Sequence, residues 1–140
     1  MPLERLDHYS VNTHDIERTT RFYVDVLGLV DGARPPFEFP GAWLYAGDKA
    51  VVHVVGVGPH GGWGMDEGPG ATALLTPPGS GNLDHISFWG SGLKAMRDHL
   101  VALGMPFQQR RIPGRELSQL FLDDPNGITV ELTYPETIPA

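Results

Sequence analysis

Residues 82–88, Asn-Leu-Asp-His-Ile-Ser-Phe, decide the fold, because the chain contains this stretch twice. Its counterpart is residues 5–11, Arg-Leu-Asp-His-Tyr-Ser-Val, which lies 77 residues earlier when counted from His85 back to His8. Each copy is followed by a helix-like segment that ends at a glycine, Gly28 or Gly104. An internal repeat of this length indicates that one unit of secondary structure has been duplicated.

The second half of the repeat carries the same correspondence. Residues 45–54 align with residues 121–132, with a difference of two residues in the turn. His53 therefore corresponds to Glu131, just as His8 corresponds to His85. Packing alone gives no reason for four metal-binding residues to occupy four equivalent places in two copies of one unit.

Hydrophobic periodicity predicts the same order of elements in both units, β-α-β-β-β. In the first unit, a helix begins near Asp15 and ends at Gly28, with Asp15 or Thr13 as its N-cap. In the second unit, a helical stripe begins at Leu93 and ends before Gly104. The expected strands are residues 6–12, 29–34, 43–46 and 50–57, and then 83–89, 107–112, 117–123 and 128–134.

Alternation along the strands predicts which side chains share a face. The polar face would carry His8, Ser10, His85, Ser87, Thr129, Glu131 and Thr133. Two histidines and one carboxylate on adjoining strands form the facial triad that holds a divalent metal and leaves its other positions open. The simpler interpretation, polar side chains on the wet face of a sheet, suits any one histidine better than it suits three equivalent positions. His53 is open to three roles: a fourth ligand, an acid-base group, or a buried structural histidine.

Composition sets limits on the class of protein. A chain of 140 residues with 41% hydrophobic and 19% charged residues fits one folded domain. The absence of cysteine excludes disulfides, thiolate metal sites and a cysteine nucleophile. A net charge of −7 argues against a nucleic-acid partner, and the one adjacent basic pair, Arg110-Arg111, is interpreted as a solvated strand end. No apolar run is long enough to span a membrane and no secretory signal is visible, so a cytoplasmic location is expected.

These motifs resemble the vicinal oxygen chelate superfamily, which includes glyoxalase I, extradiol dioxygenases, methylmalonyl-CoA epimerase, and fosfomycin- and bleomycin-resistance proteins. The resemblance covers residues 6–134 and rests on residues 6–8, Phe22-Tyr23 with residues 27–29, residues 83–88 and residues 121–132. It implies an α+β fold in which two paired β-α-β-β-β modules form a curved, mostly antiparallel sheet around a metal site. The whole chain, 1–140, would then be a single domain, with module one at about 5–57, a linker at about 58–81 and module two at about 82–134.

The resemblance also implies a ligand set. His8, His85 and Glu131 match the three ligand positions that the dioxygenase and fosfomycin branches share. His53 falls at the fourth position, where glyoxalase I has glutamate and the epimerase has glutamine, and the histidine departs from both patterns. Short members with two modules often dimerise, so a homodimer is expected.

Coordination numbers separate the enzyme hypotheses. With three protein ligands, a six-coordinate ion keeps three open positions, enough for a bidentate catechol and dioxygen; with four, it keeps two, which suits a bidentate enediolate. The leading hypothesis is an extradiol-type dioxygenase for a small catechol-like substrate, with His53 moving a proton and Fe(II) or Mn(II) favoured over Zn(II) or Ni(II). Phe37, Phe39, Trp43 and Trp89 would line an apolar pocket in that case, or else simply pack.

Two alternatives stay open. The first is a glyoxalase I-like lyase or an epimerase, in which the metal acts as a Lewis acid on a substrate with adjacent oxygens. The second is a metal-free module that binds a small molecule, as bleomycin-resistance proteins do. Metal analysis of protein purified without chelator separates this binding module from both enzymes.

Overall fold

The computed structural model describes residues 2, 4–57, 79–81 and 83–138 of the chain. Most of the predicted linker at 58–81 therefore lies outside the described residues. The chain divides into two compact units, Met1–Pro77 and Pro78–Ala140. Among the described residues, no helix has the length and apolar character needed to cross a membrane.

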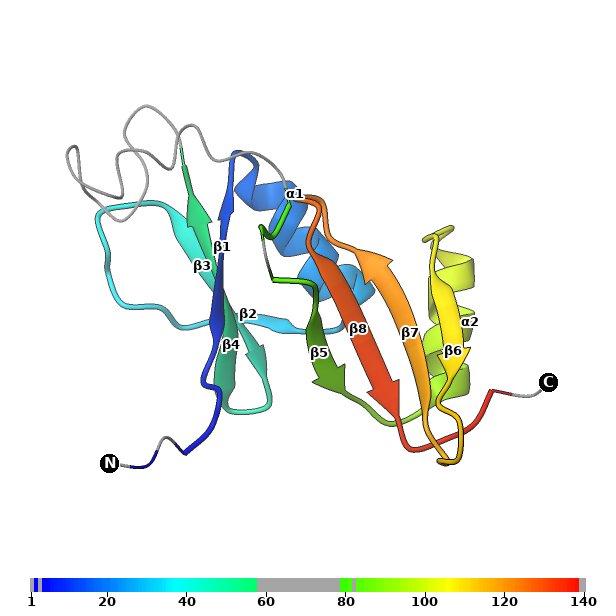
Figure 1. Cartoon of the computed structure of the whole chain (residues 1–140). Coiled ribbons are helices and arrows are strands. Elements are labelled where there is room, and N and C mark those ends of the chain that lie inside the picture. The colour runs from blue at the N-terminus through cyan, green and yellow to red at the C-terminus, as the bar shows by residue number, and fades with distance from the viewer. Residues whose placement is uncertain (1, 3, 58–78, 82, 139–140) are drawn as a thin grey trace. The chain divides into compact units, whose positions relative to one another are not determined.

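The first unit is a four-stranded sheet with one helical segment. Its elements are β1 (Tyr9–Thr13), α1 (Ile16–Arg21), a π-helical turn η1 (Phe22–Val26), β2 (Val30–Gly32), β3 (Gly41–Ala46) and β4 (Lys49–Gly56). The strand order is β1-β4-β3-β2, with β1 parallel to β4 and the other neighbours antiparallel. Figure 1 shows β1 beside β4 in this unit.

The second unit repeats that topology. Its elements are β5 (Ile86–Trp89), α2 (Leu93–Ala102), β6 (Gln108–Arg111), β7 (Ser118–Asp123) and β8 (Thr129–Tyr134). The strand order is β5-β8-β7-β6, with β5 parallel to β8 and the other neighbours antiparallel. The expected α+β class and the order β-α-β-β-β in each module are confirmed, as is the mostly antiparallel pairing.

The repeat extends to the pairing register. In the first unit Ser10 lies opposite His53 on the parallel neighbour. In the second, Ser87 lies opposite Glu131 in the same way. His53 and Glu131 therefore occupy equivalent points of two equivalent ladders, as the alignment of the two halves predicts.

The helix of the first unit begins as predicted and then widens. The Asp15 carboxylate accepts a hydrogen bond from the Arg18 amide at 3.0 Å, which is an N-cap. Beyond Arg21 the predicted continuous helix is replaced by the turn η1, and Gly28 at φ 81° closes the segment. The predicted stop at a left-handed glycine is therefore correct, although the last turn is not α-helical.

The helix of the second unit is capped from a distance. Its N-cap is Gly92 at φ 79°, which has no side chain to satisfy the first amides. The Glu136 carboxylate, which follows β8, accepts hydrogen bonds from the Gly92 and Leu93 amides at 3.0 and 3.2 Å. This contact replaces a local cap and ties the segment after β8 to the start of α2.

Burial follows the predicted alternation. Val11, Val52 and Val54 are buried in the first unit, whereas Ser10, which precedes Val11 in β1 and points to the opposite face, is exposed. In the second unit the buried core comprises Leu93, Leu100, Leu120, Leu122, Val130, Leu132, Tyr134 and Ile138. One prediction needs correction: the strands begin at Tyr9 and Ile86, so His8 and His85 immediately precede β1 and β5 rather than lie within them. Backbone pairing starts at Tyr9 with β4 and at Ile86 with β8.

Candidate metal centre

The second unit brings two of the predicted ligands together. Glu131 lies in β8, and His85 immediately precedes the parallel neighbour β5. The His85 Nε2 atom is 3.6 Å from the Glu131 Oε2 atom. The Glu131 side chain is 7% exposed and that of His85 is 37% exposed, so the pair faces solvent from the imidazole side.

This separation fits two ligands of one ion. Imidazole nitrogen and carboxylate oxygen bind divalent metals at about 2.1 Å, so two such atoms at right or tetrahedral angles lie about 3.0 to 3.4 Å apart. The His85 Nε2 and Glu131 Oε2 atoms would need to come only slightly closer together to reach this range. His85 and Glu131 are therefore suited to hold a divalent ion together.

The surroundings of Glu131 support the same reading. Among the described residues its carboxylate has two polar side-chain neighbours, the His85 Nε2 atom and the Thr133 hydroxyl, which donates to Oε2 at 3.4 Å. Thr133 Oγ1 in turn lies 3.1 Å from the Ser87 hydroxyl. A buried carboxylate with such long contacts is stabilised by a nearby cation, and a bound divalent ion supplies one.

An aspartate orients the histidine in each copy of the repeat. The distance from His8 Nδ1 to an Asp7 carboxylate oxygen is 2.6 Å, and from His85 Nδ1 to an Asp84 oxygen it is 2.7 Å. A hydrogen bond from Nδ1 to a carboxylate leaves Nε2 unprotonated and available to a metal. Asp7 also forms an ion pair with Lys49, and its hydrogen bonds with Lys49 and His8 lower its carboxyl pKa to about 2.

In the first unit, the side chains of His8 and His53 stack face to face and do not point at a common position. The His8 and His53 rings lie 3.7 Å apart between centroids at an interplanar angle of 15°. The other face of His53 stacks on Trp43 at 4.1 Å and 11°. Burial, and secondly the nearby His8, lower the pKa of the His53 imidazole.

This stacking bears on the role of His53. An imidazole binds a metal through an in-plane lone pair, with the ion about 2.1 Å from the nitrogen. Because the His8 and His53 rings stack nearly in parallel, their in-plane lone pairs do not point at a common position. In this arrangement the two histidines would not hold one ion together.

The predicted ligands thus occur as two pairs, one in each unit. Among the described residues, no group of three His, Cys, Asp or Glu side chains gathers closely enough to hold an ion. His85 and Glu131 form the pair in the second unit, and His8 lies with His53 in the first. That His8, His85 and Glu131 hold one ion stays a prediction.

Sequence reasoning missed three supporting residues. Asp7 and Asp84 were part of the repeated motif, and the recurrence of Leu-Asp-His was the signal that pointed to them. Thr133 was placed on the correct face, but its hydrogen bond to Glu131 was not foreseen. Carboxylates and hydroxyls around metal-binding groups are the usual source of their orientation.

The aromatic residues expected around a substrate pack in part on one another. Phe37 and Phe39 stack at 5.0 Å, and the Arg34 guanidinium lies 5.1 Å from the centre of each ring. Trp43 stacks on His53, whereas Trp89 in the second unit is 69% exposed. Of the four, Trp89 presents the most open surface.

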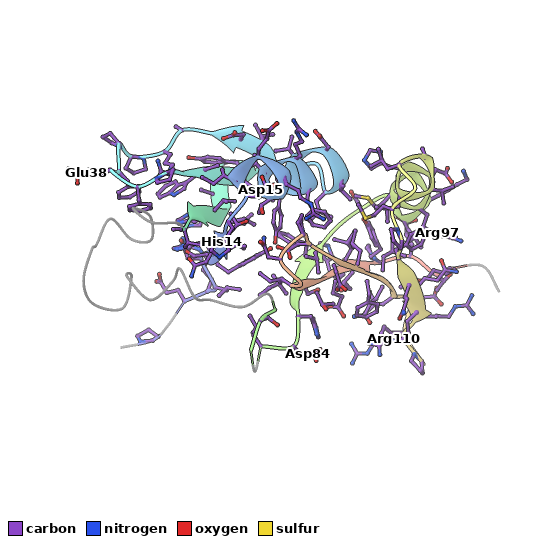
Figure 2. The ribbon with its side chains drawn as sticks, turned by 90° about the horizontal axis from the view of Figure 1, so that it is seen from above. His14, Asp15, Glu38, Asp84, Arg97 and Arg110 are labelled. Carbon is purple, nitrogen blue, oxygen red and sulfur yellow. The ribbon has the colours of Figure 1, made fainter. Side chains whose placement is uncertain are left out.

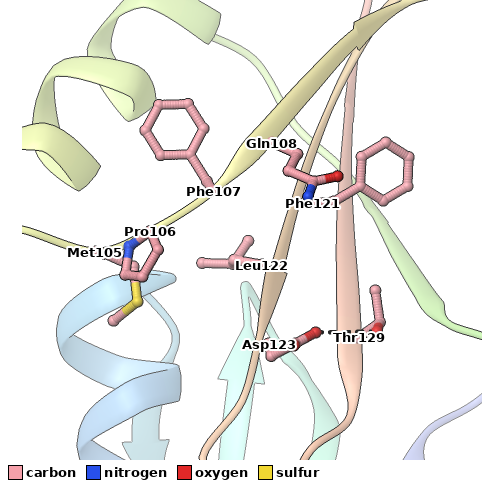
Figure 3. Close-up of a pocket in the computed structure, with 8 residues that line it drawn as sticks. All are labelled: Met105, Pro106, Phe107, Gln108, Phe121, Leu122, Asp123 and Thr129. Atoms are coloured by element: carbon pink, nitrogen blue, oxygen red, sulfur yellow. Dashed lines mark hydrogen bonds between the residues drawn. The ribbon is translucent and has the colours of Figure 1, made fainter.

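A cavity of about 560 Å³ lies at one end of β6 and β7 in the second unit (Figure 3). It is lined by Met105, Pro106, Phe107, Gln108, Phe121, Leu122, Asp123 and Thr129. The Thr129 hydroxyl donates a hydrogen bond to the Asp123 carboxylate at 3.0 Å. Phe121 links this cavity to the candidate centre, since its ring meets His85 edge to face at 6.4 Å between centroids.

Comparison with known proteins identifies the family of this chain. A curated relative, Glyoxylase I 4 of Arabidopsis thaliana, is 27% identical over 140 residues, covering 98% of this chain and 74% of the relative. Virulence protein STM3117 of Salmonella typhimurium superposes with a TM-score of 0.66 at 23% identity, covering 96% of this chain and 98% of that one. Lactoylglutathione lyase of Agrobacterium tumefaciens gives a TM-score of 0.65 at 19% identity, with 95% of each chain covered. The model of the Glyoxalase/Bleomycin resistance protein/Dioxygenase superfamily matches residues 5–132, so the chain belongs to that superfamily.

Proposed function

We propose that this protein is a metal-dependent enzyme in which His8, His85 and Glu131 hold one divalent ion. The observation that carries the proposal is the His85–Glu131 pair, whose ligand atoms lie 3.6 Å apart around a buried carboxylate. The Asp7–His8 contact repeats the Asp84–His85 contact, which supports His8 as the third ligand. The single domain spans two modules joined by the linker near 58–81, and the ion draws ligands from both.

The reaction that best suits three ligands is extradiol-type ring cleavage of a small catechol-like substrate. The stacked position of His53 supports this choice, because a His53 ring that stacks on His8 would not be a ligand, and His8, His85 and Glu131 alone would leave positions for substrate and dioxygen. A bound Fe(II) or Mn(II) ion would bring adjacent substrate oxygens and dioxygen together at one centre.

His53 acts as the acid-base group in this proposal. Its lowered pKa keeps the imidazole neutral near pH 7, so it accepts a proton from a substrate hydroxyl. Trp43 and His8 sandwich the ring and restrict its rotation, which fixes the nitrogen that meets the substrate. Thr133 and the aspartates hold the ligand side chains in place.

A second candidate is a lyase or isomerase that acts on a substrate with adjacent oxygens. The names of two similar proteins favour it, since one is a glyoxylase I and another a lactoylglutathione lyase. This chemistry uses the ion as a Lewis acid and suits a fourth protein ligand. His53 would have to leave its stack on His8 to supply that ligand.

Anaerobic reconstitution with Fe(II), Mn(II), Ni(II) and Zn(II) tests the proposal. We expect one ion per complete site, oxygen uptake with catechols in the presence of Fe(II) or Mn(II), and no uptake by Glu131→Gln. Turnover of a methylglyoxal–glutathione hemithioacetal without oxygen uptake would select the lyase instead. Failure to bind any of the four metals would refute both enzymes and leave the metal-free binding module. Light scattering of the same samples tests the proposed homodimer.

A further inference from the structure

The sheet of the second unit carries a basic residue on the face of the candidate ligands. Register pairing aligns Ser87, Glu131, Phe121 and Gln108 in one row across β5, β8, β7 and β6. The next row on the same face contains Trp89, Thr133, Gln119 and Arg110. Figure 2 shows Arg110 and Asp84 on the side of this sheet away from α2.

Contacts within the unit hold the Arg110 guanidinium in place. Its Nε and Nη2 atoms donate hydrogen bonds to the Gln119 side-chain oxygen at 3.2 and 2.6 Å. Its central carbon lies 5.3 Å from the centre of the Phe121 ring, and that ring meets His85 edge to face. A cation fixed in this way loses less conformational freedom when it binds a ligand than a free surface arginine does.

The charge of Arg110 has no partner within the described part of the chain. Ion pairs there join six other pairs of side chains, none of which includes Arg110. A guanidinium has five N–H donors, and Gln119 takes two of them. The remaining donors suit an oxyanion, since a guanidinium matches both oxygens of a carboxylate.

The neighbouring arginine differs in its face of the sheet and in its hydrogen-bond partner. Arg111 lies opposite Ser118, which is buried, and therefore belongs to the other face of the sheet. Its Nη2 atom donates to the Ile138 carbonyl oxygen. Both arginines are exposed at the end of β6, as predicted for a solvated strand end, but their side chains have different partners.

We propose that Arg110 binds a carboxylate on the substrate, whose adjacent oxygens lie at the His85–Glu131 end of the same face. This inference rests on the proposed function. Arg110 and Glu131 are two strands apart, about 10 Å across the sheet, and the Phe121 ring contacts both the Arg110 guanidinium and the His85 ring. The substrate class is therefore an aromatic ring with adjacent hydroxyls at one end and a carboxylate-bearing arm at the other.

Two pairs of probes test this inference on the full chain. 3,4-Dihydroxyphenylacetate and 4-methylcatechol share the adjacent hydroxyls, and only the first carries a carboxylate; they are titrated against Zn(II)-loaded protein without oxygen. Phenylacetate and benzyl alcohol lack adjacent hydroxyls and are titrated against metal-free protein, with NMR detection of the arginine Nε resonances. The variants are Arg110→Gln and Arg110→Lys, with Arg115→Gln as the matched control because Arg115 lies in the turn after β6 and is exposed.

We expect wild type and Arg115→Gln to bind 3,4-dihydroxyphenylacetate about tenfold more tightly than 4-methylcatechol, the scale of a charge-assisted hydrogen bond. Arg110→Gln should lose that preference while its affinity for 4-methylcatechol is unchanged, and Arg110→Lys should keep part of it. Phenylacetate should shift the Arg110 Nε resonance, whereas benzyl alcohol should not.

The contrary results separate the two proposals. If both catechols bind in a metal-dependent way and Arg110→Gln retains the tenfold preference, the Arg110 inference is wrong and the proposed function stands. If phenylacetate shifts Arg110 but no metal binds, the carboxylate site survives in a protein that is not a metalloenzyme. If phenylacetate does not shift the Arg110 Nε resonance and wild type binds the two catechols equally tightly, the carboxylate site is refuted.

Discussion

Replacing His53 decides whether the candidate centre has three protein ligands or four. His53→Phe keeps a flat ring between His8 and Trp43 but removes both nitrogens. Because the stacked His53 ring would not be a ligand of an ion held by His8, this change would remove no bond to the metal. We expect the metal dissociation constant to stay within about threefold of wild type, because His53→Phe keeps the stack on His8; residues that orient a ligand by hydrogen bonds change this constant by about 10- to 100-fold.

The matched variants set the scale. Glu131→Gln and His85→Gln each replace a proposed ligand with a neutral amide, a weaker donor, so their dissociation constants should rise by more than about 100-fold. His53→Ala removes the stack on both sides at about 0.5 to 1.5 kcal/mol for each ring pair. It should therefore lower Tm by roughly 3 to 10 °C, while His53→Phe retains the Tm of wild type.

Anaerobic metal titration with a competing chelator and differential scanning calorimetry measure these quantities. With the metal retained, His53→Phe should still lose about 10²- to 10⁴-fold in kcat, because its acid-base group is gone. A dissociation constant for His53→Phe that rises as far as that of Glu131→Gln would show that His53 binds the ion. A centre with only three protein ligands would then be refuted, and the lyase candidate would be favoured.

The remaining predictions concern orientation and stability. Asp84→Ala should raise the metal dissociation constant about tenfold by freeing the Nδ1 atom of His85, and an unchanged constant would contradict this role. Glu136→Ala leaves two amides of α2 uncapped, so urea unfolding should show a loss of about 0.5 to 1 kcal/mol. Gly41→Ala drives a methyl group into a backbone carbonyl of β4, and a loss of at least about 1 kcal/mol is expected in the same assay. Burial and, secondly, Glu136 raise the pKa of Tyr134, so its contribution to stability is complete below pH 10.0 and declines as the pH rises above it; Tyr134→Phe should lack that decline.

The order of elements was predictable because it depends on local patterns. Alternation predicts strands, a 3.6-residue period predicts helices, and Gly28 and Gly104 mark their ends. Strand ends were not predictable to the residue, since pairing with a neighbour decides where a strand begins. His8 and His85 were therefore predicted within the strands, whereas the structure has them just before β1 and β5.

Part of the candidate site was predictable from the sequence. The duplicated motif pointed to His85 and Glu131, whose Nε2 and Oε2 atoms lie 3.6 Å apart, and their role as metal ligands stays a prediction. The stacking of His53 between His8 and Trp43 depends on register across three segments, which no local pattern encodes. The position of Arg110 over Phe121 depends likewise on a diagonal between two strands.

The register equivalence of His53 and Glu131 has a consequence for charge. Identical residues at those two points would give the proposed site either two acidic side chains or none. With one imidazole and one carboxylate there, a divalent ion held as proposed would keep a single net positive charge. Such a charge would favour an ionised oxygen as the next ligand.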